Sequence, residues 1–383
     1  MQKLPVEHGH GLRGLDRHAW VTLAEREVFN LVNTSLAVPH LEIEARLWDA
    51  GTTVPGAPRR VSFFPHILSE AINNLVAGGN LELTSHTTKG GATAELYVPR
   101  DARRRTTAIS AATRRKAMLY ARFLRCSTTF GAAGEAVVRT SLMDAMPVGY
   151  LPMVDKPVFG EVPRIGTADR LPGALDSGAW LVIKDRDTGI PLPPHALLVE
   201  IKNRRMTLYP RHNEVHQLLH KAALVQEQHP DLAVVPLLIC RRGHDRLFWM
   251  AKDLGFLVHA TRAQYFTMPE DTTERHVDEM RNELGLADLK LVAPDTPARI
   301  ISLFTSTIPK TAAATAARWS SVGSKLLPHY KELRLDTIDN ETRNSTLATL
   351  RLDAEAELAA AGVKDPILAW ALDPEGDAEG DWY

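Results

Sequence analysis

An apolar run that ends in a charged pair, HALLVEIK at residues 195–202, limits most strongly what this chain can fold into. Four apolar residues follow the histidine and predict an apolar strand. Side chains alternate along a strand, so Glu200 and Lys202 point to one face while Val199 and Ile201 point to the other. We therefore expect a carboxylate and an ammonium side by side at the end of this strand.

The composition indicates a chain with a large hydrophobic core. It has 383 residues and 44% hydrophobic content, which favours two or three domains. A formal charge of -1 excludes a uniformly basic nucleic-acid coat protein but allows a local basic patch. Cys126 and Cys240 are too few for a disulfide framework or a thiolate zinc site. We recognise no signal peptide and no membrane-spanning run, so we expect a soluble protein of a reducing cytoplasm.

After an N-terminal segment (1–19), the pattern predicts three helices and a hairpin. The first helix is predicted from about Thr22, the second in HLEIEARLWDAG and the third in PHILSEAINNLVAGG, because apolar residues recur there at helical spacing. The two glycines that close the last stretch end the third helix. LELTSHTTKGGATAELYV then alternates on both sides of a Lys-Gly-Gly turn, as two paired strands do. This order resembles a winged helix-turn-helix domain over residues 20–100, with the helix at about 65–77 in the recognition position.

Winged helices bind DNA, bind proteins or only pack, and the sequence leaves these alternatives open. The polar side chains expected at the surface of the recognition helix are His66, Ser69, Glu70, Asn73 and Asn74. None of them is a strong phosphate anchor, but Asn73 and Asn74 are suited to base edges. Lys89, at the tip of the wing, is a further candidate for nucleic-acid contact.

A basic linker helix is predicted at residues 101–126, where Asp101 is the one acid. The candidate phosphate contacts are Arg103, Arg104, Arg105, Arg114, Arg115 and Lys116, followed by Arg122 and Arg125. A helix with this charge density can follow a phosphate backbone, because each neutralised phosphate releases a counterion. A solvated linker helix is the alternative.

Residues 127–268 predict an α/β core that brings acids together. GAAGEAVVRTSLMDAM is a predicted helix carrying Glu135, and GALDSGAWLVI places Asp176 at the start of an apolar strand. The strand ALLVEIK follows after a Gly/Pro-rich loop. Two consecutive strands joined by a turn can pair directly, so Asp176 is expected to approach Glu200 and Lys202.

Carboxylates this close repel each other unless a cation lies between them. Oxygen ligands with open coordination positions suit Mg²⁺, with Mn²⁺ as an alternative, and such an ion activates water and stabilises charge on phosphorus. The ammonium of Lys202 can orient the nucleophile or stabilise the same charge. The pattern therefore predicts metal-dependent phosphodiester hydrolysis.

At these residues the chain resembles the PD-(D/E)xK superfamily of restriction-endonuclease-like nucleases. The resemblance implies Asp176 and Glu200 as metal ligands, Lys202 as the catalytic lysine and Glu135 as an added acidic ligand. It also places Gln217, on the following helix, near the active site. LAVVPLLICRR, HDRLFWMAKDLG and FLVHA supply the further strand, helix and strand of a mixed sheet flanked by helices. Asp169 in GTADRL competes for the role of Asp176.

The resemblance implies a Mg²⁺-dependent endonuclease that acts on DNA, in defence against foreign DNA, as in some restriction and anti-phage nucleases. RNA as the substrate, a homodimer and a protein partner from a defence or mobile-element system stay open. The alternative function is a non-enzymatic regulator that uses a nuclease-like fold as a binding platform.

The histidine spacing and the C-terminal region indicate no catalytic site. His212, His216 and His220 recur every four residues, a spacing at which two imidazoles can bind zinc. Glu214 stands one place too late for the H-E-x-x-H motif, so we expect a polar helix face instead. Residues 269–372 predict a helical C-terminal region, and 373–383 an acidic tail.

Overall fold

The computed structural model describes residues 16–57, 59–100, 106–154, 160–166, 169–185, 187–293 and 295–371. Two units divide the chain. Unit 1 comprises residues 1–129, 268–289 and 375–383, and unit 2 comprises 130–267 and 290–374. No helix in the described ranges is long and apolar enough to cross a membrane. The predicted acidic tail lies outside these ranges.

Unit 1 contains the three predicted helices and the hairpin. The elements are α1 (Arg17–Ser35), α2 (His40–Ile43) with a π-helical continuation (Glu44–Asp49), α3 (Pro65–Ala77), β1 (Leu81–Thr87) and β2 (Thr93–Pro99). The helices enclose an aromatic core in which Trp20 meets Phe63 edge-on and Trp48 lies against Phe64. The order of elements is as predicted, and winged-helix identity stays a prediction.

The predicted basic linker is α4 (Thr106–Ser127) within the described residues. Ala117 of this helix shares a small core with Leu96 and Val98 of β2. The second partner of α4 is α8 (Glu274–Glu283), which comes from a segment far along the chain. The basic helix is therefore packed on two sides inside unit 1.

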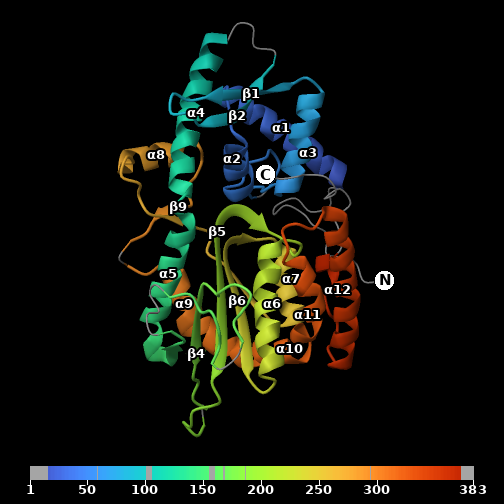
Figure 1. Cartoon of the computed structure of the whole chain (residues 1–383). Helices are drawn as coiled ribbons and strands as arrows, with labels where there is room; N and C mark the ends of the chain where they lie inside the picture. The colour runs from blue at the N-terminus through green and yellow to red at the C-terminus, as the bar shows by residue number, and fades with distance from the viewer. Residues whose placement is uncertain are drawn as a thin grey trace. The chain divides into compact units, whose positions relative to one another are not determined.

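Unit 2 is built on a five-stranded mixed sheet (Figure 1). Its strands, in spatial order, are β3 (Tyr150–Pro152), β4 (Ser177–Leu181), β5 (His195–Leu208), β6 (Ala233–Gly243) and β7 (Leu257–Ala260). β3, β4 and β5 pair antiparallel, whereas β5, β6 and β7 pair parallel. The parallel pairs are connected through α6 (Asn213–Gln228) and α7 (Asp245–Leu254), as parallel pairing requires.

Helices cover both faces of this sheet. One face packs against α6, α7, α11 (Leu327–Leu333) and α12 (Asn340–Ala360), and the other against α5 (Phe130–Asp144) and α9 (Ala298–Ser302) (Figure 1). α10 (Ile308–Ser321) contributes to both cores. The smaller elements are Met146–Val148, β8 (Gln264–Phe266), β9 (Leu289–Leu291), Leu303–Thr307, Gly323–Leu326 and Ala369–Ala371. The α/β class, with a mixed sheet flanked by helices, is confirmed.

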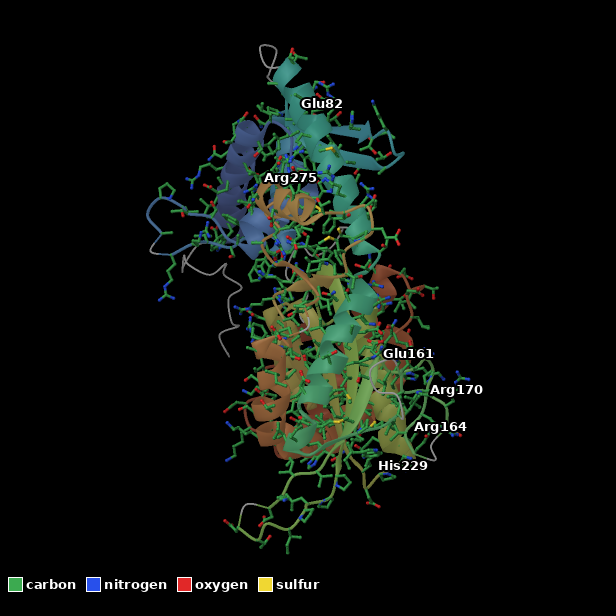
Figure 2. All side chains as sticks on the ribbon, turned by 90° about the vertical axis from the view of Figure 1, so that its left-hand side faces the viewer. Glu82, Glu161, Arg164, Arg170, His229 and Arg275 are labelled. Carbon is green, nitrogen blue, oxygen red and sulfur yellow. The ribbon has the colours of Figure 1, made fainter. Side chains whose placement is uncertain are left out.

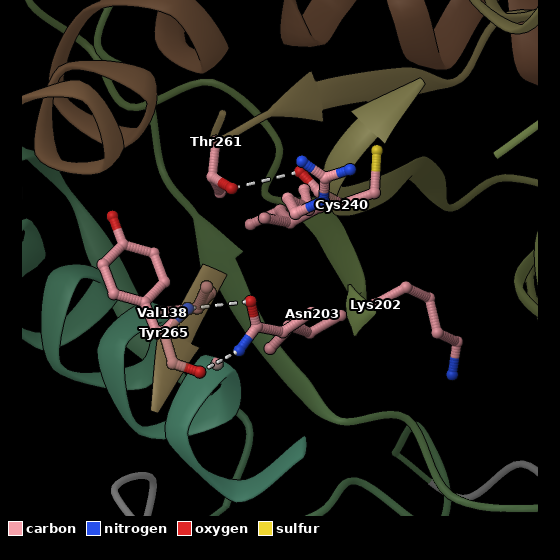
Figure 3. A pocket seen from close by; sticks show the side chains of 10 residues that line it. Val138, Lys202, Asn203, Cys240, Thr261 and Tyr265 are labelled. Carbon is pink, nitrogen blue, oxygen red and sulfur yellow. Dashed lines mark hydrogen bonds between the residues drawn. The ribbon is translucent and has the colours of Figure 1, made fainter. Parts of the chain in front are cut away.

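A close approach fixes α5 on β5. The side-chain amide of Asn203 donates to the carbonyl oxygens of Phe130 (2.8 Å) and Tyr265 (2.6 Å), and its Oδ1 accepts from the Tyr265 amide. Figure 3 shows the bonds between Asn203 and Tyr265. A Cβ atom on Gly134 would lie only 2.5 Å from the Asn203 Cβ. The helix that carries Glu135 can therefore approach β5 this closely only because position 134 is glycine.

Substituting Gly134→Ala is expected to destabilise the protein by about 1–3 kcal/mol, because overpacking here forces the helix away from Asn203. Gly131→Ala is the matched control in the same helix, where a Cβ would meet nothing within 4 Å. That change is expected to stabilise by up to about 1 kcal/mol, since alanine is the better helix former. Urea unfolding measures both values. Equal effects of the two substitutions would contradict the close approach.

Candidate active site

Pairing of β4 with β5 brings Asp176 opposite Glu200. Ser177 is the register partner of Val199, so the residues before and after them are neighbours in the antiparallel ladder. Asp176 Oδ2 accepts a hydrogen bond of 2.6 Å from the backbone amide of Ile201. The predicted approach of Asp176 to the end of the apolar strand is observed.

Glu200 is buried, with 3% exposure, and each of its carboxylate oxygens accepts from an ammonium. Lys202 Nζ donates to Oε1 at 2.8 Å, as the alternation of side chains along β5 predicts. Lys221 Nζ, from α6, donates to Oε2 at 2.9 Å. A buried carboxylate needs such partners, because an isolated charge would be too costly to remove from water.

Lys221 is a site residue that the sequence pattern did not single out. Its ammonium, in a residue that is 6% exposed, also donates to the carbonyl oxygen of Ala174 at 2.7 Å. Gln217, which was predicted to lie near the site, is half-buried one helical turn before Lys221. The spacing of four residues puts both on one face of α6, so the place of Gln217 near the site stays a prediction, whereas Lys221 contacts Glu200 directly.

α5 contributes a third acid, Glu135, and a cation, Arg139. Arg139, 7% exposed, forms an ion pair of 2.9 Å with Glu135. It also donates from Nε (2.9 Å) and Nη2 (2.6 Å) to the backbone carbonyl of Asp176. Glu135 is therefore linked to the site through an arginine that the sequence pattern did not single out either.

The electrostatics single out Asp176. Burial, followed by the charge of Glu200, raises its pKa to about 6, against the opposing effects of Lys202 and the Ile201 amide. Burial works against the charged form of Lys202, but Glu200 and Asp176 outweigh it and raise the pKa of that ammonium. Lys202 is thus cationic at neutral pH, while Asp176 is close to its titration point.

Two carboxylates are a sufficient protein contribution to a magnesium site. Mg²⁺ usually keeps several waters and binds one or two carboxylates together with substrate phosphates. Asp176 and Glu200 fit this requirement, and the raised pKa of Asp176 marks a position where a further positive charge would stabilise the ionised form. In the part of the chain that the structure describes, no three His, Cys, Asp or Glu residues form a metal-holding group.

The competing acid, Asp169, lies elsewhere. It is exposed, and its backbone amide donates to Gln228 Oε1, at the last residue of α6. Other charged side chains of this loop, Glu161, Arg164 and Arg170, project from the surface of unit 2 (Figure 2).

The three histidines do not form the expected polar face. His216 is fully buried, bonds the carbonyl oxygen of Pro210 and stacks on Tyr330 of α11. Burial lowers the pKa of His216 to about 3 and that of His220 to about 4, so both are neutral packing residues. His212 Nδ1 accepts from the Tyr209 amide. The expectation of a polar face is corrected, because the C-terminal helices cover this side of α6.

On α3 of unit 1, the residues predicted to be exposed differ in their surroundings. Ser69 is buried and donates to the Pro65 carbonyl oxygen, which corrects its predicted exposure. Three others have partners: His66 stacks on Phe64, Glu70 pairs with Arg17 and Asn74 donates to Glu25. Asn73 is exposed.

The cations of α4 face carboxylates of unit 1. Arg115 pairs with Glu283 and Glu279, Lys116 with Glu42, Arg122 with Glu279 and Arg125 with Asp271. Lys116 is only 8% exposed. Arg114 is exposed, as is Lys89 at the hairpin turn, whereas Arg103, Arg104 and Arg105 lie outside the described residues. Glu279 and Glu283 are four residues apart and therefore lie on one face of α8. The sequence around them does not indicate that their partners are on α4.

The raised pKa of Asp176 predicts a pH-dependent stability. Between its ordinary value of 3.8 and about 6, the folded protein holds a proton that the unfolded chain releases, so stability falls as pH rises through this window. Asp176→Asn removes the titrating group. As pH rises from about 4 to about 7, the free energy of unfolding of this variant is therefore expected to rise relative to that of wild type, by up to about 3 kcal/mol. Urea unfolding across this range measures the difference. Asp169→Asn is the control, and a gain of equal size there would contradict the assignment.

No family model matches the chain, and comparisons with curated proteins and with solved structures gave no match either.

Proposed function

We propose that unit 2 is a Mg²⁺-dependent endonuclease that hydrolyses phosphodiester bonds of DNA. The observation that carries the proposal is the meeting of Asp176, Glu200 and Lys202 where β4 and β5 pair. The helix, strand and loop order around them is the one expected from the PD-(D/E)xK resemblance, which supports the same assignment.

Each side chain has a role that its surroundings support. Asp176 and Glu200 would hold Mg²⁺, which when bound lowers the pKa of a water molecule and neutralises phosphate charge. Lys202 stays protonated and can donate to the attacking water or to a phosphate oxygen. Arg139 holds the backbone of Asp176 and the carboxylate of Glu135, so Glu135 acts from the edge of the site.

A binding platform without catalysis is the second candidate. Three carboxylates, Asp176, Glu200 and Glu135, are matched by three cations, Lys202, Lys221 and Arg139. Such a set is balanced without a metal, as a purely structural ion network would be. The two candidates differ in whether the protein turns over a nucleic acid.

Cleavage of plasmid DNA by the purified protein is expected with Mg²⁺ and not with EDTA. Glu200→Gln is expected to abolish cleavage and to leave DNA binding intact or slightly tighter, because it removes a metal ligand and also a charge that repels phosphate. Glu227→Gln, an exposed change on α6, is the matched control. Lys202→Ala is expected to slow cleavage while metal binding is retained.

Wild-type cleavage by the Glu200→Gln protein would place the metal elsewhere. If the wild-type protein binds DNA but never cuts it in Mg²⁺ or Mn²⁺, the binding platform is the better description.

DNA affinity from unit 1 is expected to depend on the arginines of the basic stretch whose charges are not paired with acids of unit 1 in the described residues. Replacing Arg103, Arg104, Arg105 and Arg114 with Gln should weaken binding about equally for all sequences. It should also flatten the salt dependence by about 0.9 in slope for each phosphate that the protein no longer neutralises. Arg115 and Lys116 are left intact, because their ion pairs are within unit 1. Arg275→Gln, on α8 (Figure 2), is the control, since it removes one exposed arginine of unit 1 that lies outside the basic helix.

Asn73→Ala is expected to alter preference among sequences more than overall affinity. Fluorescence anisotropy with labelled duplexes, at several salt concentrations, separates the two effects. Unchanged binding in both variants would favour a protein-docking role for unit 1, whether the partner is a second copy or another protein of a defence system.

A further inference from the structure

The second ammonium on Glu200 has a consequence for any metal at the site. Lys221 donates to Glu200 Oε2, and Lys202 donates to Oε1, so both carboxylate oxygens already meet a positive charge. Both lysines are largely buried, with side-chain exposures of 7% and 16%. Buried charges are poorly screened, so a divalent cation that approaches Glu200 is repelled strongly by both.

The two lysines differ in what holds them. Lys202 belongs to the same strand as Glu200 and donates its hydrogen bond to that carboxylate. Lys221 comes from α6 and has a second acceptor, the carbonyl oxygen of Ala174, at 2.7 Å. An ammonium has three donors, so Lys221 can loosen its bond to Glu200 and still keep a buried partner. It is the cation better able to yield to a metal.

We propose that Lys221 is a built-in counter-cation, which neutralises Glu200 when no metal is bound and lowers the affinity of the site for divalent metal. The inference rests on the proposed function, because it takes Glu200 as a metal ligand. Lys221 is a positioning residue: it acts through Glu200 and holds the loop before Asp176 through Ala174. Metal binding then becomes an exchange of one cation for another, which keeps the affinity low until substrate phosphates add negative charge.

Metal binding by variants of Lys221 tests this exchange. Lys221→Gln retains a hydrogen-bond donor but removes the charge, and Lys221→Met removes both. With MnCl₂ alone as the probe, isothermal titration calorimetry is expected to show binding about tenfold tighter in Lys221→Gln than in wild type, equivalent to about 1.4 kcal/mol. Lys221→Arg keeps the charge, so its Mn²⁺ affinity is expected to stay within about twofold of wild type.

Thermal unfolding supplies a readout that does not depend on activity. Without metal, Lys221→Gln and Lys221→Met are expected to melt at lower temperature than wild type, because Glu200 loses a buried partner. Addition of Mn²⁺ is expected to raise their melting temperatures by more than that of wild type. Lys325→Met breaks an ion pair of 2.6 Å with Glu357, so it is the matched control and should leave the Mn²⁺ response unchanged.

Failure of the inference and failure of the proposed function are distinguishable. If wild type binds Mn²⁺, Glu200→Gln does not, and Lys221→Gln binds no more tightly than wild type, the counter-cation role is overturned while the metal site stands. Mn²⁺ binding by Lys221→Gln but not by wild type supports the counter-cation role, because the native affinity is then too low for the metal alone, without substrate phosphates. If no variant binds Mn²⁺ at millimolar concentration, both are overturned. When Lys221→Met does not fold, Lys221→Gln decides alone.

Discussion

A buried carboxylate, Glu200, governs how the centre of unit 2 is arranged. A charge with 3% exposure is tolerated only when its oxygens are paired, and here two ammonium groups from different elements pair them. Lys202 comes from the same strand, so its pairing with Glu200 is a local contact that does not depend on how distant segments pack. Lys221 comes from α6, so its pairing requires the helix to return across β5. The same ammonium then holds Ala174, and with it the approach of Asp176 to the ladder.

Unit 1 contains a second buried carboxylate that is also paired with two cations. Glu42 is fully buried and accepts from Lys116 of α4 and from Arg46, one turn along its own helical segment. Lys116 and Arg46 also donate to the backbone carbonyl of Glu283, at the end of α8. The basic helix is thus bound by acids and carbonyls of its own unit. Several of its positive charges therefore serve packing within unit 1, so the charge density of the helix alone does not indicate affinity for phosphate.

The proposed chemistry and the observed ion network place opposite demands on one set of side chains. A nuclease needs Asp176 and Glu200 negative enough to attract a divalent cation, whereas folding needs their charges compensated. Burial and the charge of Glu200 raise the pKa of Asp176, while Glu200 has a cation on each oxygen. Among the described residues, the side chain of Asp176 accepts from a backbone amide and not from an ammonium group, so it is the carboxylate of the two that is better able to accept a metal ion. A metal would be drawn there first and would compete with lysines only at Glu200.

Local pattern alone determined the α/β class, the strand that ends in Glu200 and Lys202, and the pairing that brings Asp176 to them. These features depend on alternation, apolar runs and neighbouring strands, all of which act over short stretches of chain. Only the tertiary structure decided that Lys221 and Arg139 complete the site, that Asp169 and the histidines do not, and that Lys116 faces Glu42. Each of these depends on which charges meet after helices cross the sheet or distant segments pack. Coulomb attraction selects partners by distance in space, and separation along the chain does not report that distance.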